Sequence, residues 1–389
     1  MLKGKNILLG VTGSIAAYKS VDLARRLAGE NAGVTVVMTE AACRFVSPLT
    51  FETVLGKPVH TDLFDGYLTH INLVKESHLL VIAPATANTI NKLACGIADN
   101  LLSTLWLAYQ GPALIAPAMN SRMYKNPVVK KNLKALAKMG VNFIGPASGK
   151  LACDEEGTGR MTGTSDIIEH IKSILTPKDL SGHKIIVTAG PTREPLDPVR
   201  FLSNRSSGKM GFAIATAAFR RGADVTLISG PTSLTPPEGI SFIPVERAVD
   251  MESAIFKKLP KSTSVIMAAA VSDFAPSAES KSKMPKNNEM TASFKKTPDI
   301  LQKIGRKKGK RLLIGFAAET GRDIKKAKDK LKNKNLDLIV LNDVSGKGAG
   351  FDVDTNIVTI IDKSGKIVDY PLMKKGKVAD IILDKMLQL

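Results

Sequence analysis

Short apolar runs recur along the first part of the chain, and most are followed by stretches of helical period. The runs are KNILLGV (5–11), VTVVMTE (34–40), LLVIAPAT (79–86), ALIAPAMN (113–120) and NFIGPA (142–147). A helix is predicted from Ser14 to about Gly29, and amphipathic stretches lie at 88–109 and 127–139. Apolar strands that alternate with helices predict a parallel sheet that is buried on both faces.

The segment LTPKDLSGHK (175–184) interrupts this pattern with Pro, Gly and polar residues, and it is interpreted as a linker. The pattern then restarts, with strands predicted at 184–192, 223–232, 264–274, 312–320 and 337–344 and helices at 208–221, 247–259, 298–309, 322–334 and 374–388. Segment 355–371 alternates around Ser-Gly, which is typical of an antiparallel hairpin. We predict an α/β protein with two doubly wound, Rossmann-like domains at 1–177 and 178–389, the second with a β-hairpin.

Composition agrees with this division, because 389 residues exceed what one hydrophobic core usually organises. No apolar run reaches the length of a membrane span, and the Lys-flanked start lacks a signal peptide, so a cytoplasmic protein without membrane contact is expected. Three widely spaced cysteines argue against a disulfide framework, and the spacing of zinc ligands is absent. Cys43 and Cys95 lie in apolar, helical contexts and are predicted to be core residues.

The net charge is +19, and residues 257–334 hold 21 Lys and Arg against 7 Asp and Glu. This excess raises the possibility of nucleic acid, but RGG repeats and interleaved aromatic residues are absent, so a nucleic-acid partner is not predicted. The lysines form either a solvated face or a surface that neutralises a phosphorylated small molecule.

Candidate ligand-binding residues follow the predicted strands, since ligands of doubly wound sheets bind beyond the carboxyl ends of the strands. In GVTGSIAAYK (10–19), Gly10 and Gly13 allow a tight turn, and Ser14 and a helix N-terminus offer donors to an anion. The motif lacks the full GxGxxG, so a dinucleotide is not indicated. The polar residues of 84–104 either bind a ligand or simply cap a helix.

Together GSIAAYK, THINL (69–73), APATANT, PAMN (117–120) and GKLACDEEGTGRM (149–161) resemble the flavin-dependent cysteine decarboxylase family over residues 5–172. The resemblance implies a bound FMN, which takes an electron pair from the substrate thiol so that charge left by departing carbon dioxide spreads onto sulfur. The implied cofactor-binding residues are Gly13, Ser14, Ser103 and Thr104 near the phosphate and Thr39, Thr86, Asn88 and Met119 near the ring.

The same resemblance implies three catalytic residues. His70 matches the family's essential histidine, Asn120 would bind the carboxylate end of the substrate, and Cys153 matches the flap cysteine that supplies a proton. The family usually has Gly after this cysteine, whereas here Asp154 follows it. Nearby acids raise the thiol pKa, which suits a proton donor.

In the second half, SSGKMG fails the P-loop pattern because Met follows the lysine. The motif nevertheless opens a helix, and it is suited to hold phosphate through Ser206, Ser207, Gly208 and Lys209. The stretch 188–215, with AAAVSDF (268–274), KKTPDIL (295–301), GFAAET (315–320) and LNDVS (341–345), resembles the phosphopantothenate–cysteine ligase family. The order of the two halves is that of fused, bifunctional proteins of coenzyme A synthesis.

This second resemblance implies that CTP activates the carboxylate of 4′-phosphopantothenate as an acyl-cytidylate, which the amine of cysteine then attacks. Asn204 would handle the acyl-cytidylate, Arg200 a phosphate, and Asp273 a Mg²⁺ ion. Ala269, Phe316 and Asn342 would contact the nucleotide. KMPK replaces the usual KIKK, so Lys283 is the preferred catalytic lysine, with Lys281 and Lys286 left open.

The expected partners are therefore small molecules, namely 4′-phosphopantothenate, L-cysteine and CTP, although the sequence does not decide between CTP and ATP. The resemblance also implies a homo-oligomer with FMN sites between protomers, as trimers within larger assemblies such as a dodecamer. Two alternatives stay open: a flavoprotein decarboxylase with a non-catalytic C-terminal assembly domain, and a flavin-binding regulator without turnover.

Overall fold

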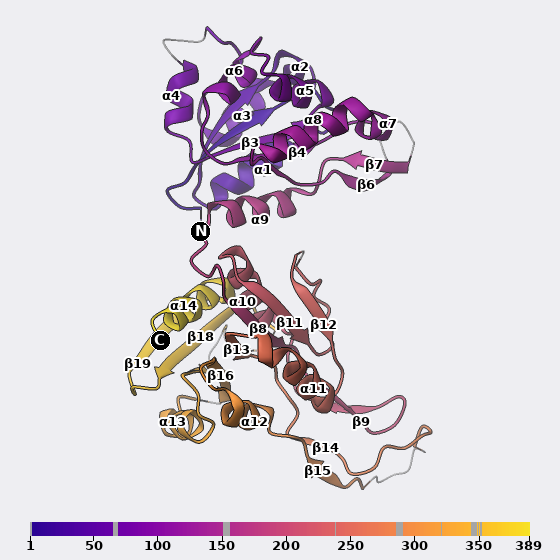
Figure 1. The fold of residues 1–389 in the computed structure, drawn as a ribbon, viewed down its shortest axis with the longest axis vertical. Helices are drawn as coiled ribbons and strands as arrows, with labels where there is room; N and C mark the ends of the chain where they lie inside the picture. Colours follow the sequence, from indigo (N-terminus) through magenta and orange to yellow (C-terminus); the bar gives the residue numbers. More distant parts are fainter. Residues whose placement is uncertain are drawn as a thin grey trace. The chain divides into compact units, whose positions relative to one another are not determined.

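The structure is a computed structural model, and it describes residues 2–64, 69–150, 156–237, 239–284, 291–319, 321–343, 348, 350 and 352–389. The internal contacts divide the chain into two compact units, Met1–Thr176 and Pro177–Leu389 (Figure 1). No helix within the described ranges combines the length and the apolar character needed to cross a bilayer.

The N-terminal unit is built on a five-stranded parallel sheet in the order β2-β1-β3-β4-β5. Its strands are β1 (Asn6–Val11), β2 (Gly33–Met38), β3 (Leu79–Ala85), β4 (Ala113–Pro117) and β5 (Asn142–Phe143). Strands β3 and β4 are buried along their whole length, which explains why they are continuous apolar runs rather than alternating ones.

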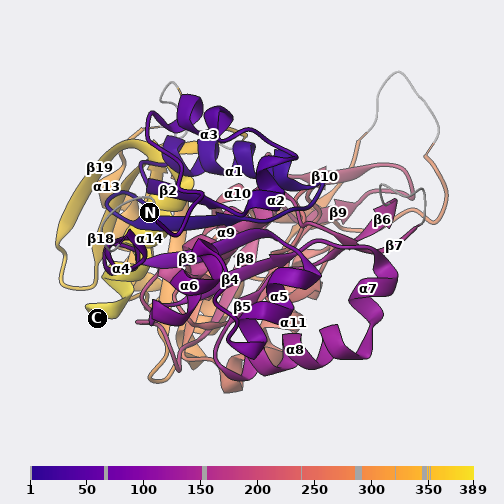
Figure 2. The ribbon, with the colours of Figure 1, turned by 90° about the horizontal axis from the view of Figure 1, so that it is seen from above.

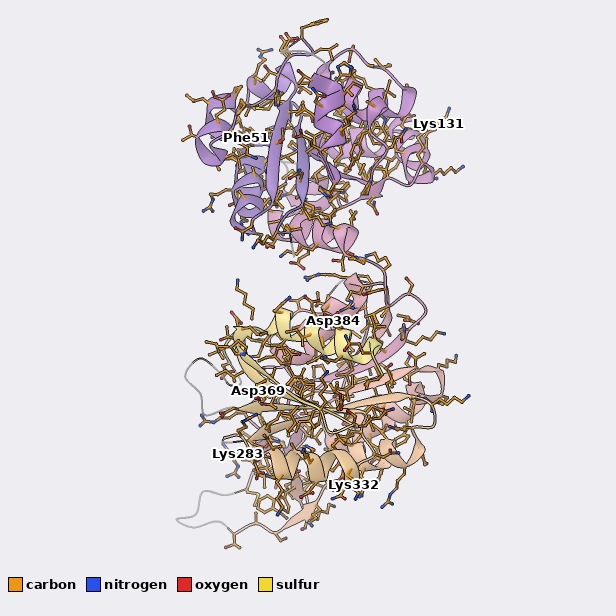
Figure 3. The ribbon with its side chains drawn as sticks, turned by 90° about the vertical axis from the view of Figure 1, so that its left-hand side faces the viewer. Phe51, Lys131, Lys283, Lys332, Asp369 and Asp384 are labelled. Atoms are coloured by element: carbon orange, nitrogen blue, oxygen red, sulfur yellow. The ribbon has the colours of Figure 1, made fainter. Side chains whose placement is uncertain are left out.

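Helices cover both faces of this sheet (Figures 1 and 2). Alternate strand residues belong to two separate cores. One core holds α1 (Ala17–Gly29), α3 (Pro48–Leu55) and α9 (Thr164–Leu175). The other holds α5 (Ala87–Cys95), α6 (Leu101–Ala108) and α8 (Pro127–Lys138). Phe51 of α3 is fully buried among the side chains of the first core (Figure 3).

Shorter elements complete this unit. They are α2 (Glu40–Cys43), α4 (Thr69–Lys75), α7 (Ser121–Lys125) and an antiparallel pair, β6 (Ala147–Lys150) with β7 (Glu156–Arg160). The main chain of β7 lies against the start of α7, where the N–H of Met119 donates to the carbonyl of Gly159 at 3.0 Å. The β6–β7 pair flanks residues 151–155, so Cys153 and Asp154 lie outside the described residues.

The C-terminal unit contains an eight-stranded sheet in the order β12-β11-β8-β13-β16-β17-β18-β19. Its first six strands are parallel, and the last two form the predicted antiparallel hairpin. The strands are β8 (Lys184–Ala189), β11 (Asp224–Ser229), β12 (Ser241–Pro244), β13 (Ser264–Met267), β16 (Leu312–Glu319), β17 (Leu338–Asp343), β18 (Thr355–Asp362) and β19 (Ile367–Lys374).

Two layers of helices again enclose the sheet (Figure 1). One face packs against α10 (Lys209–Arg220) and α14 (Lys375–Leu387). The other packs against α11 (Ala248–Lys258), α12 (Ile300–Lys307) and α13 (Ile324–Asn333), with the 3₁₀ turn Leu259–Lys261 after α11. The predicted fold class, two doubly wound α/β units with a hairpin in the second, is confirmed.

Several local predictions were wrong or incomplete. The stretch 88–109 is two helices, because Gly96 adopts a left-handed conformation after α5 and Asn100 and Ser103 form a capping box before α6. The strand expected over 264–274 ends at Met267. Small antiparallel pairs were not predicted: besides β6–β7, these are β9 (Arg193–Pro195) with β10 (Phe201–Ser203), and β14 (Phe274–Pro276) with β15 (Phe294–Lys296).

Candidate active sites

The N-terminal unit has a cavity of about 1100 Å³ at the carboxyl edge of its sheet. The sheet order reverses between β1 and β3, which is where doubly wound folds bind ligands. Thr12 joins the two strand ends, because its buried hydroxyl donates to the carbonyl of Pro84 at 2.8 Å and accepts from the N–H of Thr86 at 3.0 Å. These two bonds hold the ends of β1 and β3 together beside Thr86, which lines the cavity.

The start of α1 forms one wall, and its close packing requires glycine. A Cβ on Gly13 would lie 2.5 Å from the Cβ of Ala41, so only glycine lets the loop approach α2. The next residue, Ser14, lines the cavity, and its hydroxyl accepts from the N–H of Ala16 at 3.3 Å. The first turn of a helix with its hydroxyl beside it is suited to an anion.

Further predicted residues gather around the same cavity. Thr39 caps α2, and Thr86 caps α5 by accepting from the N–H of Thr89 at 3.3 Å. Asn88 is exposed on the first turn of α5 and lines the cavity, as do Met119 and Asn120. The fold thus brings together most of the residues assigned to the flavin and to the substrate carboxylate.

Cations that sequence reasoning did not assign line this cavity as well. They include Lys19, Lys150 and Arg160. Burial lowers the pKa of Lys19, and the positive charge of Arg160 lowers it further. A bound anion would relieve this repulsion. Lys19 ends the motif GSIAAYK, so its position was visible in the sequence, whereas its neighbour Arg160 comes from a distant strand.

Three of the predicted residues lie elsewhere, and a fourth is not described. Ser103 is 2% exposed, and its hydroxyl belongs to the capping box of α6. The hydroxyl of Thr104 donates to the carbonyl of Asn100 at 2.9 Å. His70 lies on α4, which packs against α6, and it does not line this cavity. Cys153 lies outside the described residues. Of the other cysteines, Cys43 is half-buried beside the core, whereas Cys95 is exposed, which corrects its prediction as a core residue.

The C-terminal unit has a second cavity, of about 850 Å³, at the carboxyl edge of its own sheet. The order of its parallel strands reverses between β8 and β13, and the segment that follows β13 lines the cavity. Other walls include the start of α10, the ends of β16 and β17, and residues of α12 and α13. The architecture of the first site is thus repeated.

The loop before α10, in which the sequence predicts a phosphate cradle, lies at the edge of this cavity. Gly208 has φ of +76°, and a Cβ there would lie 2.7 Å from Cγ2 of Thr232. Ser206 and Ser207 line the cavity, and the N–H of Gly208 donates to the hydroxyl of Ser206 at 3.4 Å. Lys209 Nζ donates to Asp354 Oδ1 at 2.7 Å and to the carbonyl of Asp352 at 2.8 Å.

Most of the other residues predicted for the nucleotide line the same cavity. Asn204 donates its amide to the carbonyl of Val271 at 2.9 Å, and Asp273 lines the cavity two residues further on. Ala269 and Phe316 also line the cavity. Asn342 reaches it as well, and its Oδ1 is buried without a hydrogen-bond partner in the described structure.

Several lysines of this cavity were not assigned from the sequence, among them Lys330, Lys334 and Lys375. Burial lowers the pKa of Lys330, the charge of Lys334 lowers it further, and its Nζ donates to the carbonyl of Phe316 at 2.8 Å. Burial also lowers the pKa of Lys375, whose Nζ contacts the carbonyls of Gly350 and Val353. Lys330 and Lys334 belong to the lysine-rich segment 257–334, for which the sequence left open a solvated face or a surface that neutralises a phosphorylated small molecule. Their position in the cavity agrees with the second interpretation.

Arg200 and Lys283 do not line this cavity. Arg200 pairs with Asp197, and its Nη2 lies 2.6 Å from Oδ2 of that residue. Lys281 and Lys283 are exposed (Figure 3 labels Lys283), and Lys286 lies outside the described residues. Among the side chains that the structure describes, no three His, Cys, Asp or Glu converge as metal ligands.

Comparison with known proteins covers both units. Residues 1–176 match the family described as Flavoprotein, and residues 180–389 match the DNA/pantothenate metabolism flavoprotein C-terminal domain. The coenzyme A biosynthesis bifunctional protein CoaBC of Bacillus subtilis (strain 168) is 47% identical over 399 residues, covering 100% of this chain and 98% of the relative. CoaBC of Escherichia coli (strain K12) is 43% identical over 395 residues, covering 99% and 97%.

A solved structure of the C-terminal domain of a CoaBC protein is 44% identical with a TM-score of 0.47, covering 54% of this chain and 98% of that one. The fold and the matched families define a flavoprotein unit joined to a pantothenate-metabolism unit. The chain belongs to the family of coenzyme A biosynthesis bifunctional proteins. This confirms the resemblance predicted from the sequence, and it favours the bifunctional interpretation over a decarboxylase with a non-catalytic C-terminal half.

Proposed function

We propose that the chain catalyses two consecutive reactions of coenzyme A synthesis. The C-terminal unit joins L-cysteine to 4′-phosphopantothenate at the expense of CTP, and the N-terminal unit decarboxylates the product to 4′-phosphopantetheine. The observation that carries this proposal is the pair of cavities, one at the switch point of each sheet, that gather most of the residues expected for each reaction.

In the ligase unit, the cradle Ser206–Lys209 supports binding of the triphosphate. Lys330 and Lys334 add positive charge on the same cavity, and Asp273 supplies one carboxylate. Mg²⁺ suits this arrangement, because it is commonly held by one or two carboxylates together with substrate phosphates. Asn204 stands two residues before the cradle in the chain and donates to the carbonyl of Val271, two residues before Asp273, and we assign its amide to the acyl-cytidylate.

The buried Oδ1 of Asn342 supports recognition of the nucleotide base. An acceptor without a partner in a cavity wall favours a ligand that donates a hydrogen bond. The 4-amino group of cytosine is such a donor, but the 6-amino group of adenine is another. The preference for CTP therefore rests on the family, and the assay must compare both nucleotides.

In the decarboxylase unit, the glycine-lined loop 12–16 and the capping residues Thr39 and Thr86 suit FMN, because they present N–H and hydroxyl groups around a cavity of adequate size. When bound, the flavin supplies reversible uptake of an electron pair. Asn120 orients the substrate carboxylate. Lys150 and Arg160 lie on the strands beside it, and with Lys19 they attract the anionic end of the substrate.

His70, Ser103 and Thr104 remain assigned to the flavin site by family resemblance, although they do not line the cavity of this chain. A site between protomers, in trimers within larger assemblies, would reconcile their positions with that role. Cys153 remains the proposed proton donor. A cytoplasmic location remains a prediction.

The test of the proposal is a coupled assay on the purified full chain. Pyrophosphate release should require 4′-phosphopantothenate and CTP, with ATP as the comparison nucleotide. Carbon dioxide release should require the amide product and bound flavin, and the protein should be yellow with about one FMN per chain. Pyrophosphate release without carbon dioxide release, from flavin-loaded protein, would remove the second reaction from the proposal.

A further inference from the structure

The β9–β10 hairpin contains a buried carboxylate that neither proposed reaction uses. Asp197, in the loop 196–200, is 2% exposed. Its Oδ1 accepts from the N–H groups of Val199 and Arg200, both at 2.8 Å, and its Oδ2 accepts from Nε and Nη2 of Arg200 at 2.8 and 2.6 Å. Burying a carboxylate is costly unless it is paired in this way. The guanidinium holds the pKa of Asp197 well below its usual range.

This ion pair also holds the main chain of a second segment. The N–H of Met284 donates to Asp197 Oδ2 at 3.2 Å, and the carbonyl of Met284 accepts from Arg200 Nη2 at 2.9 Å. Four residues earlier, the N–H of Ser280 donates to the carbonyl of Leu196 at 3.0 Å. Segment 280–284 is thus attached at both ends to the loop 196–200. The exposed Lys283 lies one residue from the attachment at Met284.

The same hairpin is attached to the nucleotide cavity at its other end. Strand β10 ends at Ser203, whose hydroxyl donates to the carbonyl of Thr192 at 2.7 Å. The next residue is Asn204, which donates to the carbonyl of Val271 in the cavity wall. One short hairpin therefore connects a wall of the cavity to the root of the candidate catalytic lysine.

We propose that Asp197, acting through Arg200, is a positioning residue of the ligase reaction: the pair fixes the main chain at Met284 and so restricts the positions from which Lys283 reaches the transferring phosphate. This inference rests on the proposed function. A lysine side chain is long and flexible, and an anchored root lowers the entropy that must be lost when its ammonium group is ordered. Arg200 is then part of the support of Lys283 rather than a ligand of phosphate.

The test is the full-length, flavin-loaded chain with the substitution Asp197→Asn. The amide keeps the size of the side chain and its capacity to accept from main-chain N–H groups, but it removes the charge that orders Arg200. We expect kcat for CTP-dependent pyrophosphate release to fall about 10- to 100-fold, as misplaced catalytic groups do. The KM for CTP should stay within about threefold, because Asp197 does not line the cavity.

A matched control exists in the same unit. Asp179 also binds an arginine through two contacts, to Nε and Nη2 of Arg221 at 2.9 and 2.7 Å. Arg221 follows α10, and its remaining contacts are with Asp380 and Asp384 of α14 rather than with segment 280–284. Asp179→Asn should leave kcat and KM unchanged, and both variants should release carbon dioxide from the preformed amide at the wild-type rate.

A double-mutant cycle separates positioning from a general structural effect. If Asp197 acts through Lys283, then D197N/K283A is no slower than K283A. The assignment would be overturned if the losses of kcat in D197N and K283A multiply in the double variant. An unchanged kcat in D197N, or a wild-type kcat in K283A, would overturn it as well. R200K keeps the charge but loses the two-point contact, and it serves as the second variant if D197N does not fold.

R200K also distinguishes the two roles of Arg200. If R200K lowers kcat in the wild-type chain but causes no further loss in the K283A variant, the result supports positioning. A higher KM for 4′-phosphopantothenate in R200K, without that effect in D197N, would identify Arg200 as a direct ligand and overturn the proposal. A wild-type chain that releases no pyrophosphate from CTP would instead refute the proposed function, and the inference with it.

Discussion

Gly208 offers the sharpest test of the nucleotide cradle, because the structure gives two separate reasons for glycine there. Its φ of +76° lies in the left-handed region, and a Cβ would approach Cγ2 of Thr232 to 2.7 Å and the nitrogen of Gly190 to 3.3 Å. In Gly208→Ala, the backbone conformation should cost about 1–2 kcal/mol. The overpacking should cost about 1–3 kcal/mol. Thr232 is only half-buried and can shift, so we expect a total of about 2–3 kcal/mol.

Two further variants separate these contributions. Gly182 has φ of +84°, and among the residues that the structure describes no neighbouring atom lies within 4 Å of the place that a Cβ would take. Gly182→Ala should therefore lose only the backbone contribution, about 1–2 kcal/mol. In G208A/T232S the offending methyl group is removed, while the hydroxyl that accepts from the N–H of Leu234 is kept. This double variant should recover the part of the free energy of unfolding that G208A loses to overpacking, but not the part lost to the backbone conformation.

The assay is urea-induced unfolding of the full chain, together with the KM for CTP in pyrophosphate release. Because Gly208 lines the cavity, G208A should raise this KM, whereas G182A should not change it. A G208A chain as stable as wild type, or one that T232S restores completely, would refute the reasoning from backbone conformation. An unchanged KM would show that the loop does not hold the nucleotide.

Four further predictions concern charge and proton transfer. Asn120→Asp should abolish carbon dioxide release, because two carboxylates repel each other, and leave pyrophosphate release intact; loss of both would contradict independent sites. Arg160→Met should raise the KM of the phosphorylated amide about fivefold, which corresponds to about 1 kcal/mol for the loss of an exposed charge. Because the positive charge of Arg160 is then absent, titration by NMR should find the pKa of Lys19 raised. Cys153→Ser should still release carbon dioxide but accumulate unreduced product; normal phosphopantetheine would exclude the proton-donor role. Because its ion pair lowers the pKa of the Asp197 carboxyl, the pair stabilises the fold above about pH 4, and this stabilisation is lost as pH falls toward the folded-state pKa. The free energy of unfolding, measured with urea between about pH 5 and 2, should therefore depend less on pH in D197N than in the wild-type chain.

Much of the fold could be predicted because the buried parallel strands are continuous apolar runs. Strands such as β3 and β13 have no face that water reaches, so their pattern is unmistakable in the sequence. The break between α5 and α6 was missed although its signals are present, namely Gly96 and the Asn100 cap. Amphipathic periodicity continued across them and outweighed these two local residues.

The small hairpins could not be predicted in the same way. Strands β9 and β10 contain three residues each, too few for a period of two to be recognised. Their stability depends on contacts distant in sequence, such as Asp197 with Met284. The role of Arg200 was consequently predicted from the family motif, while its actual partners depend on the folded chain.

The same difference separates the site residues that could be predicted from those that could not. Residues directly after buried strands or at helix starts, such as Ser14, Thr86 and Gly208, were predictable, because topology alone brings them to one edge of a sheet. Lys330 and Arg160 could not be predicted as site residues, because their place in a cavity depends on contacts with residues that are distant in sequence.

The most direct test of the account uses cysteine labelled with ¹⁴C in its carboxyl group. The purified chain, with 4′-phosphopantothenate and CTP, should incorporate the label into an amide and then release it as carbon dioxide. Flavin-stripped protein should make the labelled amide and retain the label. Release of labelled carbon dioxide at the full rate without flavin, or failure of CTP to support any incorporation, would contradict the account.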